Sequence, residues 1–327
     1  MRGLQIVDIW AMTLKARIGD NITALAKVKK LQHFKIRAWS PKFGSILSNS
    51  RLTLRSLAIW HPDDRNSSTF LDHWQRELGS GSLSPYFPAL QTLELIGLER
   101  PGEGLRRAFE NAADFMRLRS LCLGGISAGR SSLYRHLADL AARTPNEDIK
   151  LRTFEMDHHS DAAPYEYRDD METICRFFGS FGTLTSLRVL EYDNCFPKSQ
   201  RNKGLLPEPV HQAIIKHKNL ISLSVQSQDF YHWRDMEPYL STEVIATIVD
   251  SFPLLEEFDF SARPVRIGKA LALGRNLRTI SVTQIGKSRG MIKPQELVNG
   301  ILGGILDGRG GGPVHVDSFV GRITAHF

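Results

Sequence analysis

Three short stretches of the sequence carry residue types that could support chemistry. Gly286-Lys-Ser288 looks like the end of a phosphate-binding loop, but that loop needs a glycine five positions earlier, where this chain has Ser281. Asp157-His-His-Ser-Asp161 has the residue types of metal ligands, but adjacent histidines in a loop lack the spacing of a zinc site. Cys195 has no identifiable base to activate it as a nucleophile. We therefore expect no catalytic site, no cofactor and no bound metal.

Cys195 instead ends a segment with the pattern of one leucine-rich repeat. In Leu187-Arg-Val-Leu190-Glu-Tyr192-Asp-Asn-Cys195, apolar residues occupy the first, fourth and sixth positions, and the cysteine is the ninth. Because side chains alternate along a strand, we expect Leu187, Leu190 and Tyr192 to point inward. Val189, Glu191 and Asp193 are then expected to point outward. One such strand cannot bury its apolar face alone, so the pattern must recur.

The hexamer L-x-x-φ-x-φ, where φ is an apolar residue, recurs through the chain in nine copies. The copies are Leu31/Phe34/Ile36, Leu54/Leu57/Ile59, Leu90/Leu93/Leu95, Leu118/Leu121/Leu123, Leu151/Phe154/Met156, Leu187/Leu190/Tyr192, Leu220/Leu223/Val225, Leu255/Phe258/Phe260 and Leu277/Ile280/Val282. Successive copies begin 22 to 36 residues apart, whereas regular leucine-rich repeats span about 20 to 29 residues. The repeat is therefore irregular, with inserted loops in several turns.

Segments with helical spacing of apolar residues follow several hexamers, at 104–116, 132–142, 171–181 and 241–252. Alternating strands and helices predict an α/β fold, a leucine-rich-repeat solenoid of horseshoe form with a parallel concave sheet and convex helices. We expect one domain over residues 1–327, because each repeat in a solenoid contacts only its neighbours.

The two ends of the chain depart from this pattern. Residues 1–19 are interpreted as a partial repeat, because they contain Leu4-Gln-Ile6. Residues 303–327 are expected to form a glycine-rich, flexible C-terminal tail. Within it, Val314 to Phe327 is either a last strand or part of that tail.

Composition narrows the classes of function. Lys and Arg number 42 against 35 Asp and Glu, and this net charge of +7 could attract nucleic acid. The basic residues are scattered rather than clustered with aromatics, which favours a solvated surface over a nucleic-acid site. No apolar run is long enough for a membrane span, and we expect no signal peptide, because no charged start is followed by an apolar segment. Three scattered cysteines predict a reducing compartment, cytoplasmic or nuclear.

The outward positions of the hexamers are candidates for binding a partner. The first copy places His33, Lys35 and Arg37 there, and later copies place acids there, namely Glu94, Glu155, Asp157, Glu191, Asp193 and Asp259. Two interpretations stay open. The acids simply keep the face solvated, with Arg119, Arg152, Arg188 and Arg278 available to pair with them, or they dock a basic segment of a protein.

Long connections form a second candidate surface. Residues 61–86, 157–170, 193–209 and 226–240 each leave the C-terminal end of a strand, so a parallel solenoid would gather them at one rim. The last of them contains Tyr231 and Trp233, aromatic residues of the kind found in binding hot spots. The alternative is that this aromatic cluster belongs to the core.

Openings such as Phe87-Pro-Ala-Leu90-Gln-Thr-Leu93-Glu-Leu95 and Phe252-Pro-Leu-Leu255-Glu-Glu-Phe258-Asp-Phe260 resemble the repeat region of fungal F-box/leucine-rich-repeat proteins, over roughly residues 20 to 285. The resemblance implies a non-enzymatic, substrate-recognising part of a cullin-RING ubiquitin ligase. In that family an F-box docks on the ligase adaptor, but no leucine- and proline-rich F-box pattern precedes the first repeat here. Adaptor binding is therefore expected only if an F-box is present. The alternative is a ligase-independent regulator or inhibitor of another protein.

Overall fold

The computed structural model contains two compact units, Met1–Ala162 and Ala163–Phe327. The structure describes residues 6–9, 27, 29–37, 43–60, 86–97, 109, 112–124, 130–158, 164–191, 208–227, 240–261, 267–283, 299, 303, 315–319 and 322–326. The expected helix at 104–116 lies mostly outside these residues. The same holds for the connection 61–86 and for the aromatic segment around Trp233.

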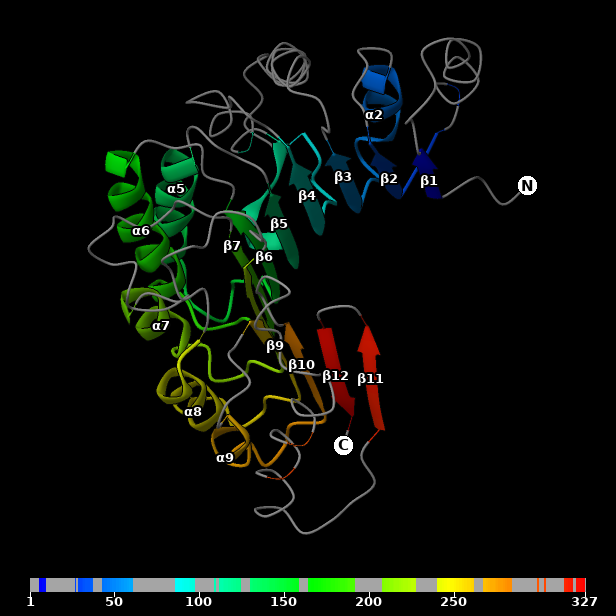
Figure 1. The fold of residues 1–327 in the computed structure, drawn as a ribbon. Coiled ribbons are helices and arrows are strands. Elements are labelled where there is room, and N and C mark those ends of the chain that lie inside the picture. The colour runs from blue at the N-terminus through cyan, green and yellow to red at the C-terminus, as the bar shows by residue number, and fades with distance from the viewer. Residues whose placement is uncertain are drawn as a thin grey trace. The chain divides into compact units, whose positions relative to one another are not determined.

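The first unit is built on parallel strands that pair in chain order (Figure 1). They are β1 (Ile6–Ile9), β2 (His33–Ile36), β3 (Ser56–Trp60), β4 (Thr92–Ile96), β5 (Ser120–Gly124) and β6 (Thr153–His158). Between them lie α2 (Gly44–Ser50), the 3-10 helix η2 (Phe115–Arg117) and α5 (Arg130–Ala142). This alternation confirms the α/β class and the parallel sheet expected from the sequence.

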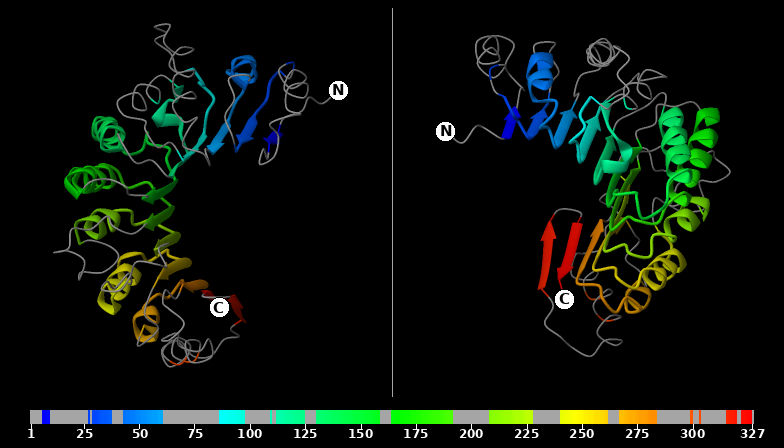
Figure 2. Two further views of the ribbon diagram at one scale, coloured as in Figure 1. Left: turned by 45° about the horizontal axis from the view of Figure 1, so that its top comes forward. Right: turned by 180° about the vertical axis from the view of Figure 1, so that it is seen from behind.

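The second unit continues the alternation and then changes direction. It contains α6 (Pro164–Gly179), β7 (Ser186–Glu191), α7 (Glu208–Ile214), β8 (Ser222–Ser227), α8 (Thr242–Ser251), β9 (Glu257–Ser261), α9 (Gly268–Leu271) and β10 (Thr279–Thr283). Strands β7 to β10 are parallel, and the helices line one side of them (Figures 1 and 2). Two further strands, β11 (His315–Phe319) and β12 (Arg322–His326), add an antiparallel hairpin to β10.

The hexamer leucines and their partners form continuous buried rows. The strand register aligns the fourth positions of neighbouring hexamers, so that Phe34, Leu57, Leu93, Leu121 and Phe154 follow one another across the first unit. All five are at most 1% exposed. Burying each such side chain stabilises the fold by about 1.5–3 kcal/mol, which explains why these positions stay apolar in every copy.

A repeated pair of backbone hydrogen bonds joins the turns at the second position of each hexamer. The carbonyl oxygen of Gln32 accepts hydrogen bonds from the N–H groups of Arg55 and Ser56, at 2.8 and 3.0 Å. The same pair recurs at the second positions of the following hexamers and again in the second unit, where the Ile221 carbonyl accepts from Glu256 and Glu257. Backbone groups that would otherwise be buried without partners are satisfied in this way, whatever side chain occupies the position.

The register predicted for the sixth hexamer is wrong by three residues. Leu187 pairs with Leu223 and Val189 pairs with Val225, the fourth and sixth positions of the next copy. The true hexamer is therefore Leu184/Leu187/Val189, and Leu184 is fully buried. Val189 consequently belongs to the buried row, and Leu190 lies on the opposite face of the strand. Position 191 pairs with Ser227 of β8.

The helices expected at 132–142, 171–181 and 241–252 are present as α5, α6 and α8. The loop expected over 157–170 is wrong in its second half, because α6 begins at Pro164. A proline is favoured in the first helical turn, where its missing N–H has no partner to lose. The connection expected over 193–209 is likewise shortened at its end by α7, which begins at Glu208.

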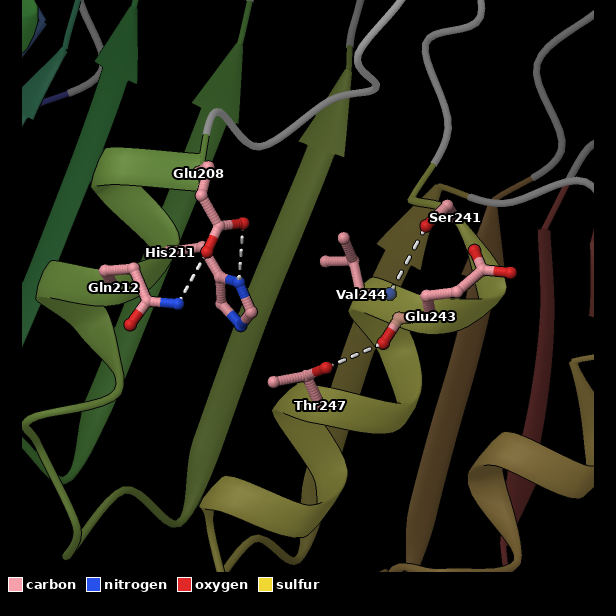
Figure 3. Close-up of polar contacts among 7 residues, drawn as sticks. All are labelled: Glu208, His211, Gln212, Ser241, Glu243, Val244 and Thr247. Carbon is pink, nitrogen blue, oxygen red and sulfur yellow. Dashed lines mark hydrogen bonds and ion pairs between the residues drawn. The ribbon is translucent and has the colours of Figure 1, made fainter.

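A serine side chain caps the N-terminus of helix α8 (Figure 3). The Ser241 hydroxyl accepts a hydrogen bond from the backbone N–H of Val244 at 3.3 Å, as its position before the apolar run predicts. Glu243 lies in the first turn, where its pKa is lowered, chiefly by its own backbone N–H and then by the Ser241 hydroxyl. The Thr247 hydroxyl donates to the Glu243 carbonyl at 2.9 Å.

The structure adds detail at both ends of the chain. Register places Val7 beside Phe34 and Ile9 beside Ile36, so Leu4/Val7/Ile9 forms a tenth hexamer of the same pattern. Of the two interpretations of Val314–Phe327, the strand agrees with the β11–β12 hairpin. Between residue 303 and that hairpin the expected glycine-rich stretch lies outside the described residues.

Candidate protein-binding surfaces

Each row of strands has an outer face, defined here as the side opposite the buried hexamer residues. On the outer face of the first unit, Lys35, Arg37, Trp60 and Glu94 form what we call the Trp60 cluster. Register places Lys35 beside Ala58, and Ala58 beside Glu94, so the cluster extends over β2, β3 and β4. Ala58 is only 5% exposed, because the longer side chains of the cluster lie around it.

Three polar contacts hold the Trp60 ring in the cluster. The Lys35 ammonium lies 4.1 Å from the ring centroid, and the guanidinium carbon of Arg37 lies 4.4 Å from it. Both distances are within the range of cation–π attraction. The indole N–H of Trp60 donates to a Glu94 carboxylate oxygen at 2.7 Å. A large aromatic side chain is thus fixed in one orientation on a face that the buried core does not use.

The outer face of the second unit is recessed over β7 to β10. This recess, which we call the hydroxyl groove, has a volume of about 460 Å³. Its polar lining comes from seven residues: Arg188, Ser222, Ser224, Glu257, Asp259, Thr279 and Ser281. The recess exists because short serine and threonine side chains stand on neighbouring strands between longer charged ones. Its volume is in the range of ligand sites, about 300–1,000 Å³.

Carboxylates and hydroxyls in the hydroxyl groove are arranged for hydrogen bonding. One carboxylate oxygen of Asp259 accepts a hydrogen bond from the Ser224 hydroxyl at 3.3 Å and another from the Gln226 side-chain amide. Glu257 is exposed at the adjacent outward position, and Arg188 stands at the far side of the groove on β7. This set of donors and acceptors suits recognition of a polar or basic group.

The acids that the sequence predicted as one docking surface can be followed only in part among the described residues. Glu94 is occupied in holding Trp60, and Asp259 lines the hydroxyl groove. Glu155 is half-buried on the outer face of β6. The side chains of Asp157 and Glu191 lie outside the described residues, and so do Asp193, Tyr231 and Trp233. Glu155 belongs to the first unit and position 191 to the second.

The arginines expected to neutralise the acids also fall in different places. Arg278 pairs with Glu256 at 3.6 Å, and both residues occupy second positions of neighbouring hexamers. Arg188 was predicted at a second position, but the corrected register places it at a fifth position, inside the hydroxyl groove. Glu256 is not one of the predicted outward acids, so the neutralising role stays a prediction.

Trp60 was not predicted as a binding residue, although its place in the sequence carries a signal. Trp60 follows the sixth position of the hexamer Leu54/Leu57/Ile59, a position that should point outward. An aromatic residue at an outward position is not explained by the core, so it marks a candidate contact. Lys35 and Arg37 were predicted to point outward, and the structure confirms that neither belongs to the buried rows.

Two buried histidines on the helical side of the second unit were also not predicted. His211 on α7 is 2% exposed, and its Nδ1 lies 3.7 Å from the exposed carboxylate of Glu208 (Figure 3). His217 is fully buried in the turn that follows α7. Its Nδ1 accepts a hydrogen bond from the backbone N–H of Leu184 at 3.4 Å, and burial lowers its pKa from 6.5 to about 4. The neutral ring therefore acts as a structural acceptor.

Metal binding, cysteine nucleophilicity and membrane spanning have little support in the part of the chain that the structure describes. No group of three or more His, Cys, Asp or Glu side chains lies close enough there to hold a metal ion. Burial raises the pKa of the Cys175 thiol to about 11, so this cysteine is protonated at neutral pH and is a poor nucleophile. Among the described helices, none combines the length and the apolarity needed to cross a membrane.

Comparison with known proteins gives no family for this chain. No protein-family model matches it, and no curated protein is similar to it in sequence.

Proposed function

We propose that this protein is a non-enzymatic scaffold, a leucine-rich-repeat solenoid of horseshoe form, that binds a protein partner on its outer faces. The observation that carries the proposal is the hydroxyl groove. Its outward residues alternate along β8 and β9 with buried ones such as Leu223 and Phe258, so the core is complete without them. Polar side chains that are not needed for folding, gathered in a recess over four strands, are what a binding surface requires.

A steric block in the groove tests this proposal. Ser222 is half-buried and lines the groove, and Ser222→Tyr would fill part of it. The matched control is Gln212→Tyr, which places the same bulk at an exposed position of α7. The tagged chain and both variants are used for affinity capture from cell extract, with bound proteins quantified by mass spectrometry. Circular dichroism and thermal melting confirm that each variant is folded.

Support for the proposal is a protein that binds the unmodified chain and Gln212→Tyr but is lost with Ser222→Tyr. Retention of all bound proteins by Ser222→Tyr would contradict the groove as the binding surface. Capture of nothing by the folded chain would contradict the scaffold function itself.

A narrower proposal is that the scaffold is the substrate-recognition part of a cullin-RING ubiquitin ligase. What supports it is the resemblance of the hexamer openings to fungal F-box/leucine-rich-repeat proteins. The same capture experiment decides this, because ligase adaptor and cullin subunits would then be present in stoichiometric amounts. Their absence beside a groove-dependent partner favours the ligase-independent regulator, and both versions place the protein in the cytoplasm or nucleus.

A further inference from the structure

The polar side chains of the hydroxyl groove form two rows, which the strand register defines. The first, which we call the Glu257 row, crosses β8 to β10 and contains Ser222, Glu257 and Thr279. The second, which we call the Asp259 row, crosses β7 to β10 and contains Arg188, Ser224, Asp259 and Ser281. Because neighbouring strands lie about 4.8 Å apart, the members of one row stand next to one another across the groove.

The two rows differ in charge. The Asp259 row contains one carboxylate and the guanidinium of Arg188, so its charges sum to zero. The Glu257 row contains one carboxylate and two hydroxyls, and no cation. Arg278, which directly precedes this row on β10, pairs with Glu256 at 3.6 Å. The Glu257 row is therefore a local negative site on a chain whose net charge is +7.

The acceptors of the Glu257 row are open to a ligand. Glu257 is exposed, and its carboxylate makes no hydrogen bond or ion pair with another residue that the structure describes. The hydroxyl of half-buried Ser222, on the neighbouring strand, also has no partner among the described residues. The Asp259 carboxylate, in contrast, already accepts hydrogen bonds from Ser224 and Gln226. A donor from a partner would therefore find its acceptors in the Glu257 row.

The chemistry of this row suits a lysine side chain. An ammonium group has three N–H donors and no acceptor, so it binds best where several acceptors stand together. The Glu257 carboxylate supplies the charge, and the hydroxyls of Ser222 and Thr279 stand on either side of it. A free amine would use this row alone, whereas the groove extends over four strands, roughly 14 Å. A protein segment uses that length, because its backbone groups can reach the Asp259 row.

We propose that the hydroxyl groove binds a basic segment of a protein, with a lysine ammonium held by the Glu257 carboxylate and the Ser222 hydroxyl. This inference rests on the proposed scaffold function and names the chemistry of the partner that the groove takes.

The test measures binding of fluorescein-labelled peptides to the full chain by fluorescence anisotropy. The probe alternates lysine with alanine, and the comparison probe is a glutamate–alanine peptide of equal length. The overall charge of +7 favours the glutamate peptide, so tighter binding of the lysine peptide reports a local site. Glu257→Gln removes the carboxylate from the groove. Its matched control, Glu172→Gln, removes an exposed carboxylate from α6 and gives the same net charge.

We expect the lysine peptide to bind more tightly than the glutamate peptide. Glu257→Gln should weaken its binding about fivefold, as the loss of one ion pair at an exposed carboxylate predicts, and Glu172→Gln should change it by less than about 1.5-fold. Ser222→Ala keeps the net charge and should weaken binding about twofold, because one acceptor of the ammonium is lost. A diffuse negative potential would not respond to Ser222→Ala. Circular dichroism confirms that each variant is folded.

Three results would overturn the proposal: glutamate-peptide binding at least as tight as that of the lysine peptide, equal effects of Glu257→Gln and Glu172→Gln, or unchanged binding by Ser222→Ala. Failure here is distinct from failure of the scaffold function. A captured partner that is lost with Ser222→Tyr but retained by Glu257→Gln leaves the scaffold standing and removes only the basic segment as its ligand.

Discussion

Protonation of His217 is expected to destabilise the second unit as the pH falls below neutral. The ring is fully buried, with centroids 6.2 Å from the Phe178 ring and 5.1 Å from the Phe181 ring. The pKa of His217 is lowered from 6.5 to about 4, mainly by burial and also by the nearby Lys216 ammonium. A proton on Nδ1 would also remove the acceptor that the Leu184 N–H uses. The folded state therefore resists protonation that the unfolded chain accepts.

Proton linkage gives the direction and the size of this change in the free energy of unfolding. Above pH 6.5 the histidine is neutral in both states and contributes no pH dependence. Between 6.5 and about 4 the unfolded chain binds more protons, so the free energy of unfolding falls by about 1.4 kcal/mol per pH unit as the pH decreases. The loss is about 2 kcal/mol at a pH of about 5 and about 3 kcal/mol when complete.

Urea unfolding followed by circular dichroism at pH values of about 7.5 and about 5 measures this loss. The comparison is His217→Asn, whose side-chain oxygen can take the place of Nδ1 as an acceptor and does not titrate. This variant should be less stable at the higher pH, because the ring contacts with Phe178 and Phe181 are lost. It should nevertheless lose about 2 kcal/mol less than the unmodified chain on acidification. An equal loss in both proteins would refute the assignment of this pH dependence to His217.

Two further predictions concern stability and use the same urea measurement. A methyl group at position 274 would lie 2.5 Å from Leu277 Cδ1 and 2.7 Å from Val249 Cγ1, so Gly274→Ala should destabilise by about 1–3 kcal/mol. Gly303→Ala, which meets nothing within 4 Å, is its control, and equal effects of the two would contradict the steric argument. Ser241→Ala removes the cap of α8 and should cost about 1 kcal/mol, whereas Ser241→Thr keeps a capping hydroxyl. No loss in Ser241→Ala would show that the cap is replaced by solvent.

Most of the strand order could be predicted from the sequence, because one hexamer marks each turn. Eight of the nine predicted hexamers stand in the predicted register, and their first, fourth and sixth residues are buried. The spacing of apolar residues predicts the strands correctly because side chains alternate between the two faces of a strand, and one of these faces must be buried.

The sixth hexamer was misplaced because its sequence contains two overlapping frames. Leu184, Leu187 and Val189 satisfy the pattern, and Leu187, Leu190 and Tyr192 satisfy it too. Cys195, at the ninth place of the second frame, favoured the wrong one. Burial alone would not have decided the question, since Leu190 is only 5% exposed on the opposite face. Only pairing with β8 fixes the frame, and pairing is not readable from one strand.

The candidate surfaces were harder to predict than the fold, because they depend on contacts between strands. The alternation of side chains along each strand predicts which acids point outward. It does not show that the Glu94 carboxylate accepts a hydrogen bond from Trp60, which comes 34 residues earlier in the sequence. The hydroxyl groove was missed because serine and threonine carry no charge pattern. Its depth arises only when β7 to β10 bring short side chains side by side.

Stability and recognition place different demands on the same strands. Replacing a buried hexamer residue such as Leu57 by alanine leaves a cavity and typically costs about 2–5 kcal/mol, whereas surface substitutions usually cost less than about 0.5 kcal/mol. Trp60 lies on the side where folding requires little, and its contacts there are cation–π attractions and one hydrogen bond. Trp60 adds little to the buried core, so we explain its position by binding of a partner. The same reasoning applies to the serine and threonine hydroxyls of the hydroxyl groove.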